Sequence, residues 1–333
     1  MADLDEQGIF RDTKFRQKRK HGAWREVPAP ELGSVVADTH AHVHLLSDPV
    51  LSLARAAVHG VGFVCAIVDP AEDGWDALDR LGQWRRRAAS VAYEIEPSLQ
   101  ALCASCPHPK VPALRVAVGV HPHNAKGYDD QLERALAERL RDDERVSAVG
   151  EIGLDYHYDL SPRDVQRSVF RRQLALAREA GLPVALHVRE AHDDAFAILA
   201  EEGFPEAGTL LHCYNLGPEE LRRWLDAGCF VAFGGALTFK RAEEVREAAK
   251  LVPLDRLLTE TDAPYMAPEP LRGNECGPEY VVFTAEALAR VRGADGSPEE
   301  LEAFLGQLYR NAVGLLDRPR PEPCPKEEAP CIA

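Results

Sequence analysis

The stretch Val149-Gly150-Glu151-Ile152-Gly153-Leu154-Asp155-Tyr156 places a carboxylate near the end of a predicted buried strand. Residues 146–153 are small or apolar except for Ser147 and Glu151. An unpaired carboxylate there would cost on the order of several kcal/mol in desolvation, so we expect cationic groups beside Glu151. Four other short apolar runs end in a histidine or an aspartate and offer such groups: 35–42, 182–187, 208–212 and 256–262.

Around this stretch, from Ser34 onward, the chain alternates short β-branched runs with longer amphipathic segments. This alternation is typical of repeated βα units that build a parallel sheet. Eight runs predict strands: 35–39, 62–68, 113–120, 146–152, 183–188, 209–212, 230–234 and 256–261. Eight strands separated by helical segments indicate an α/β fold, a single-domain (β/α)8 TIM barrel, with the active site at the carboxyl ends of the strands.

The clearest predicted helix follows the fourth strand. Ser161 can cap this helix, Pro162 suits its first turn, and Gly181 can stop it. Two later segments are expected to close the barrel: 278–291 and a final helix that Ser297 opens.

The long segment between the second and third strands contains an expected helix at 75–89 and the pair Cys103 and Cys106. This spacing can form half of a zinc site or a redox dithiol, but no second pair with zinc-finger spacing follows, so we favour no chemical role. Cys324 and Cys331 are expected to be incidental thiols.

The composition is that of a globular protein of 333 residues, with 45% hydrophobic and 28% charged residues. No apolar run approaches the roughly 20 residues that span a bilayer, and the polar amino terminus shows no signal peptide. Eight cysteines are too few for a disulfide scaffold in a chain this long, so we expect a reducing cytoplasm. No feature indicates a protein partner.

The formal net charge of −15 opposes extensive nonspecific binding to duplex nucleic acid. Two bound divalent cations would reverse this effect locally. The net charge therefore limits the area over which the protein can contact nucleic acid more than it limits the reaction at a metal site.

The two ends of the chain lack the periodic pattern of the middle. Residues 1–33 include seven Lys and Arg between positions 11 and 25, against Asp12 alone. We expect a flexible, disordered basic arm, and favour a solvated arm over one that contacts nucleic acid. Residues 317–333 are rich in proline and are expected to be a disordered tail. The barrel then covers residues 34–316.

His40 and His42 lie two positions apart, so on a strand both side chains project to the same side and can bind one metal ion. Asp38 lies on that side as well. Alone, this pair is weak evidence, because hydrogen-bonded buried histidines are common. The wider set is more specific because each remaining member ends its own strand: Glu151, His187, His212 and Asp262.

Four histidines and two carboxylates are too many ligands for one tetrahedral ion, so we predict a binuclear site. Glu151 is the natural bridge, because a carboxylate can join two cations roughly 3.5–4 Å apart that lower the pKa of a shared water. Imidazole nitrogens suit zinc, iron, nickel or manganese, and carboxylate oxygens also admit magnesium. The expected cofactors are two divalent cations, with Mg²⁺, Mn²⁺ and Zn²⁺ left open.

These residues resemble the TatD family of metal-dependent deoxyribonucleases, which are amidohydrolase-like TIM barrels. The resemblance covers about residues 34–315. The motifs that carry it are Asp38-Thr39-His40-Ala41-His42, Gly119-Val120-His121-Pro122-His123, Gly150-Glu151-Ile152-Gly153-Leu154-Asp155-Tyr156, His187-Val188-Arg189-Glu190-Ala191, His212-Cys213-Tyr214, Phe233-Gly234-Gly235-Ala236-Leu237-Thr238-Phe239 and Glu260-Thr261-Asp262-Ala263-Pro264-Tyr265.

The resemblance implies phosphodiester hydrolysis, with 3′–5′ exonuclease action on single-stranded DNA ends as the expected activity. DNA ends or another phosphodiester would be the substrate, and no membrane would be involved. The resemblance makes Asp262 the group that orients and deprotonates the attacking water, and Glu151 the group shared by both metals. It divides the ligands into two sets: His40, His42, Glu151 and Asp262 on one metal, and Glu151, His187 and His212 on the other.

The resemblance also implies that Arg189 and His121 contact phosphate, and we group His123 with them. Arg189 could bind a planar anion through its guanidinium fork, or it could pair with Glu190 or Asp193 on the surface. For His121 and His123 the alternative is a rigid turn with hydrogen-bonded imidazoles.

Three positions depart from the family pattern. Asn215-Leu216-Gly217 displaces a glycine that usually stands closer to His212, and Asn274-Glu275-Cys276-Gly277 precedes Pro278 where the family has a shorter segment. His44 stands where an aspartate is frequent, and we expect it at most to support a ligand. These departures concern substrate preference rather than metal binding.

Two other functions stay open. A barrel with the same metals could hydrolyse a small ester, amide or lactone, because barrel architecture does not fix the substrate. A basic or aromatic-lined groove beside the site would favour DNA. A non-catalytic, metal-binding scaffold protein is the second alternative, but structural metal sites are normally closed, whereas six ligands for two ions leave positions open for water.

Overall fold

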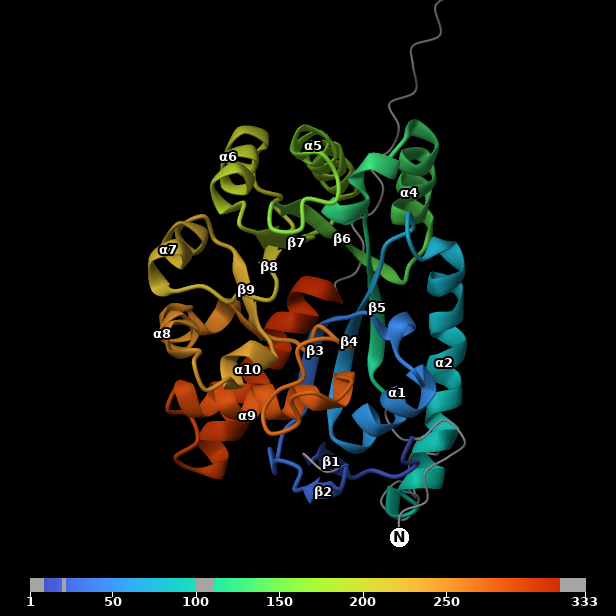
Figure 1. The fold of residues 1–333 in the computed structure, drawn as a ribbon, viewed down its shortest axis with the longest axis vertical. Helices are drawn as coiled ribbons and strands as arrows, with labels where there is room; N and C mark the ends of the chain where they lie inside the picture. The colour runs from blue at the N-terminus through green and yellow to red at the C-terminus, as the bar shows by residue number, and fades with distance from the viewer. Residues whose placement is uncertain (1–8, 20–21, 100–110, 318–333) are drawn as a thin grey trace, which may run out of the picture.

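The computed structural model describes residues 9–19, 22–99 and 111–317. At its centre lies an eight-stranded sheet in which neighbouring strands are parallel, in the order β10-β9-β8-β7-β6-β5-β4-β3. Helices surround this sheet (Figure 1), which confirms the predicted barrel. The strands are β3 (Val36–Ala41), β4 (Val61–Val68), β5 (Ala113–Val118), β6 (Val146–Asp155), β7 (Val184–Arg189), β8 (Thr209–Leu211), β9 (Phe230–Phe233) and β10 (Leu257–Thr259).

Helices follow the strands in the βα alternation that the sequence predicts. The expected helix at 75–89 is part of a longer one, α2. Cys103, Cys106, Cys324 and Cys331 lie outside the described residues, as does the tail from position 318. The helices are α1 (Pro49–Val58), α2 (Gly74–Ile95), α4 (Asp130–Asp142), α5 (Arg163–Ala180), α6 (His192–Glu202), α7 (Pro218–Asp226), α8 (Glu243–Leu251), α9 (Val281–Val291) and α10 (Pro298–Leu316).

The start of α5 differs from the prediction. Pro162, not Ser161, occupies the cap position, and the helix begins at Arg163. The Ser161 hydroxyl donates instead to the His123 carbonyl at 2.7 Å and accepts from the Lys126 backbone N–H at 3.1 Å. Ser161 thus supports the loop after β5 rather than the helix. The predicted stop is confirmed, because Gly181 takes the left-handed conformation at φ 63°.

The barrel closes at a seam between β3 and the segment that continues β10. The Asp262 N–H donates to the His40 carbonyl at 2.9 Å, and the His42 N–H donates to the Ala263 carbonyl at 2.7 Å. The buried Asp38 carboxylate reinforces this seam by accepting from the backbone N–H and the hydroxyl of Thr261, at 2.9 and 2.6 Å. The seam therefore brings the first and last of the predicted ligands together.

The barrel interior on the far side of the site is filled by small and apolar side chains. α10 closes this end: Leu315 lies against Gly208, just before β8, and Tyr309 against Gly62 at the start of β4. The α10 cap is as predicted, because the Ser297 hydroxyl accepts from the Glu300 N–H. The interior cluster contains Ala37, Phe63, Cys65, Ile67, Ala117, Ala148, Ala185, Leu210, Ala232, Leu258, Ala312, Leu315 and Leu316.

The amino-terminal region corrects the expectation of a flexible arm over 1–33. Within its described residues, β1 (Phe15–Lys18) and β2 (Trp24–Val27) form an antiparallel hairpin. Phe15 is only 4% exposed, and its ring lies 4.9 Å from the ring of Phe283 and 5.5 Å from that of Tyr280. Charge repulsion within this basic segment is reduced, because the Arg16 guanidinium donates two hydrogen bonds to the Asp12 carboxylate.

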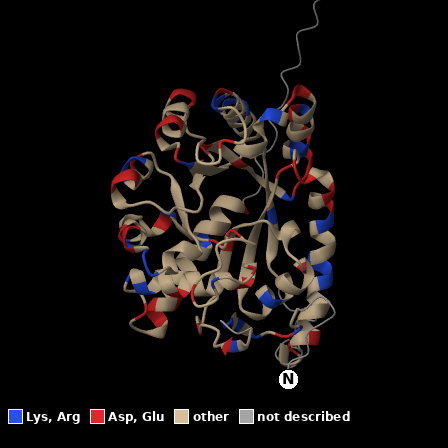
Figure 2. Ribbon diagram, in the orientation of Figure 1, with Lys and Arg blue, Asp and Glu red and all other residues tan. Residues whose placement is uncertain are grey.

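Charged residues are distributed over the outer helices. Figure 2 shows Asp and Glu interspersed with Lys and Arg rather than gathered on separate faces. Among the described residues, none of the helices combines the length and the apolarity that crossing a bilayer requires.

Replacing Phe15 by alanine tests whether the hairpin is part of the folded unit. We expect Phe15→Ala to lower the free energy of unfolding by about 3 kcal/mol, because a buried ring is removed. Trp24→Ala, at a hairpin side chain that is 40% exposed, should cost less than about 1 kcal/mol. Denaturant unfolding measures both free energies. If Phe15→Ala cost as little stability as Trp24→Ala, the expectation of a flexible arm would stand.

Candidate metal centre

The Glu151 carboxylate lies at the centre of the predicted ligands and is only 4% exposed. Its Oε2 atom faces the Nε2 atoms of His40 and His42, at 3.3 and 3.7 Å. Its Oε1 atom faces Nδ1 of His187 and Nε2 of His212, at 2.8 and 2.7 Å. The two carboxylate oxygens therefore serve two different pairs of imidazoles.

Asp262 lies on the His40 and His42 side of this arrangement. Its Oδ1 atom is 3.9 Å from Nε2 of His40 and 3.6 Å from Nε2 of His42. Its backbone is fixed by the β3 seam and adopts the left-handed conformation at φ 57°. All six predicted ligands thus lie near one another at the carboxyl ends of the strands, and the ligand atoms of His40, His212 and Asp262 also lie within 4.8 Å of one another.

The electrostatics of the centre are dominated by burial and by the close pairing of acids with imidazoles. Burial would raise the pKa of Glu151, but His212 and His40 outweigh it and hold that pKa well below its ordinary value. Burial likewise opposes the effect of His42 on Asp262, whose pKa is lowered overall. Both carboxylates are therefore ionised near neutral pH and available as ligands.

The candidate ligand atoms in this centre gather closely enough to bind metal ions, and Nε2 of His40, which faces Glu151, makes no hydrogen bond within the described residues. Within the described residues, both ring nitrogens of His40 and Nδ1 of His212 lack a hydrogen-bond partner. Ligand atoms of His40, His42 and Glu151 lie within 4.8 Å of one another, as do those of Glu151, His187 and His212. Imidazole and carboxylate groups in this arrangement match the donors that divalent transition metals prefer.

Asp155 is a functional residue that the sequence reasoning did not assign. It is fully buried, and its Oδ2 atom lies 3.0 Å from Nε2 of His187 and 2.9 Å from Nε2 of His123. His187 therefore has a carboxylate at each ring nitrogen, Asp155 on one side and Glu151 on the other. A neutral imidazole can donate to only one of them, so His187 needs either a second proton or a cation at Nδ1.

This contact with Asp155 orients the His187 ring. If the Nε2–H donates to Asp155, the Nδ1 lone pair points toward Glu151, as in the carboxylate–histidine–metal arrangement of known metal sites. The signal was present in the sequence, because Asp155 stands four positions after Glu151 on the same strand and so on the same face.

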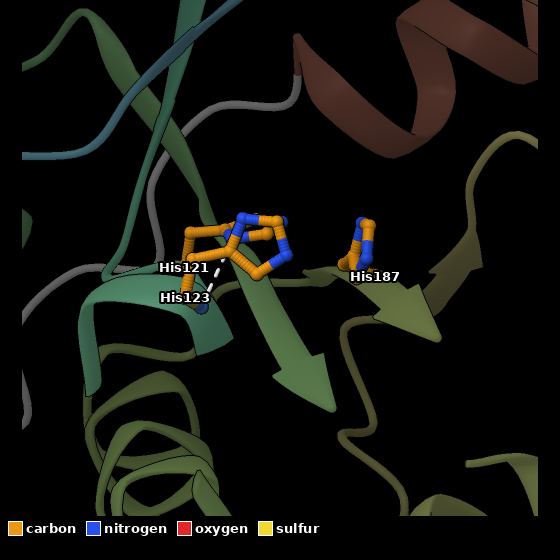
Figure 3. A group of neighbouring side chains, drawn as sticks. All are labelled: His121, His123 and His187. Atoms are coloured by element: carbon orange, nitrogen blue, oxygen red, sulfur yellow. Dashed lines mark hydrogen bonds between the residues drawn. The ribbon is translucent and has the colours of Figure 1, made fainter. Parts of the chain in front are cut away.

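His121 and His123 come from the short 3-10 helix η2 (Pro122–Gly127) and its preceding residue, and lie beside His187 at the end of β7 (Figure 3). The His123 N–H donates to Nδ1 of His121 at 3.2 Å. This contact assigns the His121 proton to Nε2, which lies 3.9 Å from Oε1 of Glu151. Burial lowers the pKa of His121 well below its ordinary value, so its ring is neutral.

Arg189 extends past the end of β7 and is exposed. The two nearby carboxylates that could pair with Arg189 on the surface, Glu190 and Asp193, contact other residues. Glu190 lies 2.7 Å from His157, and Asp193 lies 2.6 Å from Arg223. Within the described residues Arg189 has no carboxylate in ion-pair distance, and its guanidinium instead lies 4.7 Å from the centre of the Tyr158 ring.

Comparison with known proteins agrees with this geometry. The model of the TatD related DNase family matches residues 37–315. The chain belongs to the TatD family.

Relatives in this TatD family are metal-dependent hydrolases by name. YabD of Bacillus subtilis, a metal-dependent hydrolase, is 43% identical over 178 residues, which are 53% of this chain and 69% of YabD. The 3′-5′ ssDNA/RNA exonuclease TatD of Pantoea vagans is 42% identical over 203 residues, 59% of this chain and 76% of that protein. The crystal structure of YJJV, a TatD homologue from Escherichia coli, is 27% identical with a TM-score of 0.67, covering 85% of this chain and 98% of that one.

The positions that depart from the TatD pattern lie around the centre rather than in it. The Asn274 amide donates to the Arg16 carbonyl of the hairpin at 2.6 Å, and Glu275 accepts from the Ser47 hydroxyl at 2.7 Å. This segment therefore joins the amino-terminal hairpin to the loop before α1. His44 lies 2.9 Å from Asp73 and supports that loop instead of a ligand.

The Asp155 contact leads to a prediction about metal affinity. Asp155→Asn should weaken metal binding at the His187 and His212 pair about tenfold to a hundredfold, because the ring of His187 loses its orienting carboxylate. Titration of metal-free protein against a competing chelator measures this affinity. Glu190→Gln is the matched control, since Glu190 is exposed and contacts His157 only. Equal affinities of the two variants would contradict an orienting role.

Proposed function

We propose that this TatD-family hydrolase is a deoxyribonuclease that removes nucleotides from the 3′ ends of single-stranded DNA, using two divalent cations. The observation that carries the proposal is the division of the Glu151 carboxylate between two pairs of imidazoles. The name of the Pantoea vagans relative, a 3′-5′ ssDNA/RNA exonuclease, supports the choice of substrate.

The residues of the centre fit two ions with Glu151 as the shared ligand. His40, His42 and Asp262 would complete one set, and His187 and His212 the other. When bound, such cations lower the pKa of a water molecule and neutralise charge on a phosphoryl group. The choice among Mg²⁺, Mn²⁺ and Zn²⁺ stays open, because the donor set suits each of them.

We propose that Asp262 receives the proton of the attacking water. Its carboxylate is ionised, because the histidines around it outweigh the effect of burial on its pKa. Its Oδ1 atom lies 3.9 and 3.6 Å from Nε2 of His40 and His42, and the carboxylate also lies close to His212. A general base needs this combination of ionised state and position near the nucleophile.

Two further groups would hold the phosphodiester. The guanidinium of Arg189 has no carboxylate partner within the described residues, so its fork can bind two phosphate oxygens. His121 can donate from Nε2, since its Nδ1 already accepts from the backbone. His123 is held by Asp155, and we propose that it contacts substrate only through the rest of its ring.

Asp262→Asn tests the assignment of the base. We expect hydrolysis to fall at least about a hundredfold while the fold is retained, because the amide cannot take up the proton. The rate of nucleotide release at saturating substrate measures the effect, with Asp226→Asn at the end of α7 as the control. Turnover equal to that of wild type would remove Asp262 from this role.

The nuclease activity itself is tested with a 5′-labelled single-stranded oligodeoxynucleotide. Metal-free protein is titrated separately with Mg²⁺, Mn²⁺ and Zn²⁺, beside Glu151→Gln and the surface control Glu247→Gln. We expect stepwise shortening that requires both a metal and Glu151, and that Glu247→Gln retains. Absence of cleavage with every ion, in protein that still binds metal and hydrolyses a small ester or lactone, would identify a small-molecule hydrolase instead.

A further inference from the structure

Two tyrosines are exposed at the end of the barrel where the centre lies. Tyr158 follows β6 and Tyr265 follows β10, and each is 53% exposed. In the eight-stranded order, β6 and β10 are four positions apart, so the two tyrosines lie on opposite sides of the closed barrel. The metal centre lies between them.

Both rings also border histidines of the centre. The Tyr265 ring is 6.0 Å from that of His42 at an angle of 72°, and the Tyr158 ring is 5.4 Å from that of His123 at 88°. Neither tyrosine is on a loose loop. The Tyr158 N–H donates to the Asp155 carboxylate and the Tyr265 N–H to the Asp262 carbonyl, each at 2.8 Å. The backbone at each exposed ring is thus anchored to a residue of the metal centre or its support, Asp262 or Asp155.

Two arginine side chains, Arg189 and Arg272, lie over aromatic rings near the same end of the barrel. The Arg189 guanidinium lies over the Tyr158 ring at 4.7 Å, and that of Arg272 lies over the Phe239 ring at 4.1 Å. Within the described residues, neither arginine has a carboxylate within ion-pair distance. Aromatic faces combined with arginines that can bind phosphate are the elements with which proteins hold single-stranded nucleic acid.

We propose that Tyr158 and Tyr265 are stacking platforms for the unpaired bases on either side of the cleaved phosphodiester. This inference rests on the proposed nuclease function and specifies how the substrate is selected. A base in a duplex is already stacked and paired, so only an unpaired strand can place bases on both rings. Every base has a π-face, and selection by stacking is therefore tolerant of sequence.

The test compares two substrates in steady-state kinetics. One is single-stranded oligothymidylate, and the other has the same length but carries tetrahydrofuran abasic residues at its last two 3′ positions. The proteins are wild type, Tyr158→Ala and Tyr265→Ala, with Tyr158→Phe and Tyr265→Phe as ring-retaining controls. Trp24→Ala removes an exposed aromatic side chain of the hairpin. Metal content is measured for each protein.

We expect each alanine variant to raise KM for oligothymidylate about tenfold to a hundredfold, with kcat within about threefold and metal content unchanged. The phenylalanine variants and Trp24→Ala should resemble wild type. On the abasic substrate, the KM of wild type should already be as high as that of the alanine variants on oligothymidylate. The alanine substitutions should raise the KM for the abasic substrate little further.

The possible failures are distinguishable. Alanine variants with unchanged KM on oligothymidylate, or with equal losses on both substrates, would overturn the stacking platforms while leaving the nuclease in place. Wild-type protein that cleaves neither oligonucleotide with any ion would overturn the nuclease function, and the inference with it.

Discussion

The structure depends on one unfavourable placement, a carboxylate buried within β6 among four imidazoles. Removing Glu151 from water is costly, and the cost is met only because nitrogens from three other strands face its two oxygens. β3, β7 and β8 must therefore end where their histidines can face the two oxygens of Glu151.

The sequence predicts the barrel and the six ligands because both leave local signals. Each strand is a short apolar run, and each ligand stands where such a run ends. The hairpin leaves no such signal, since its strands have four residues each and Phe15 finds its aromatic partners far along the chain. The role of Asp155 was not assigned from the sequence, although its position on the strand of Glu151 was visible, because its contacts with His187 and His123 appear only in space. For Arg189 the sequence left a choice between phosphate and a surface carboxylate, because the partners of Glu190 and Asp193 also appear only in space.

For the anionic substrate that we propose, an acidic protein needs positive charge close to the metal centre. The overall charge of −15 is spread over outer helices that carry both signs (Figure 2). At the carboxyl ends of the strands, by contrast, Arg189 and Arg272 lie over aromatic rings rather than beside carboxylates. Electrostatic attraction of phosphate groups is thereby concentrated near the metal centre. This arrangement suits the end of a DNA strand better than a long DNA duplex.

The seam between β3 and the segment after β10 has a consequence for the making of the protein. His40 is translated early, whereas Asp262 and Ala263, which hydrogen-bond to its strand, emerge more than two hundred residues later. A chain that ends before Asp262 therefore lacks the segment that pairs with β3 and one of the six predicted ligands. The candidate metal centre is therefore complete only once the ring of strands has closed.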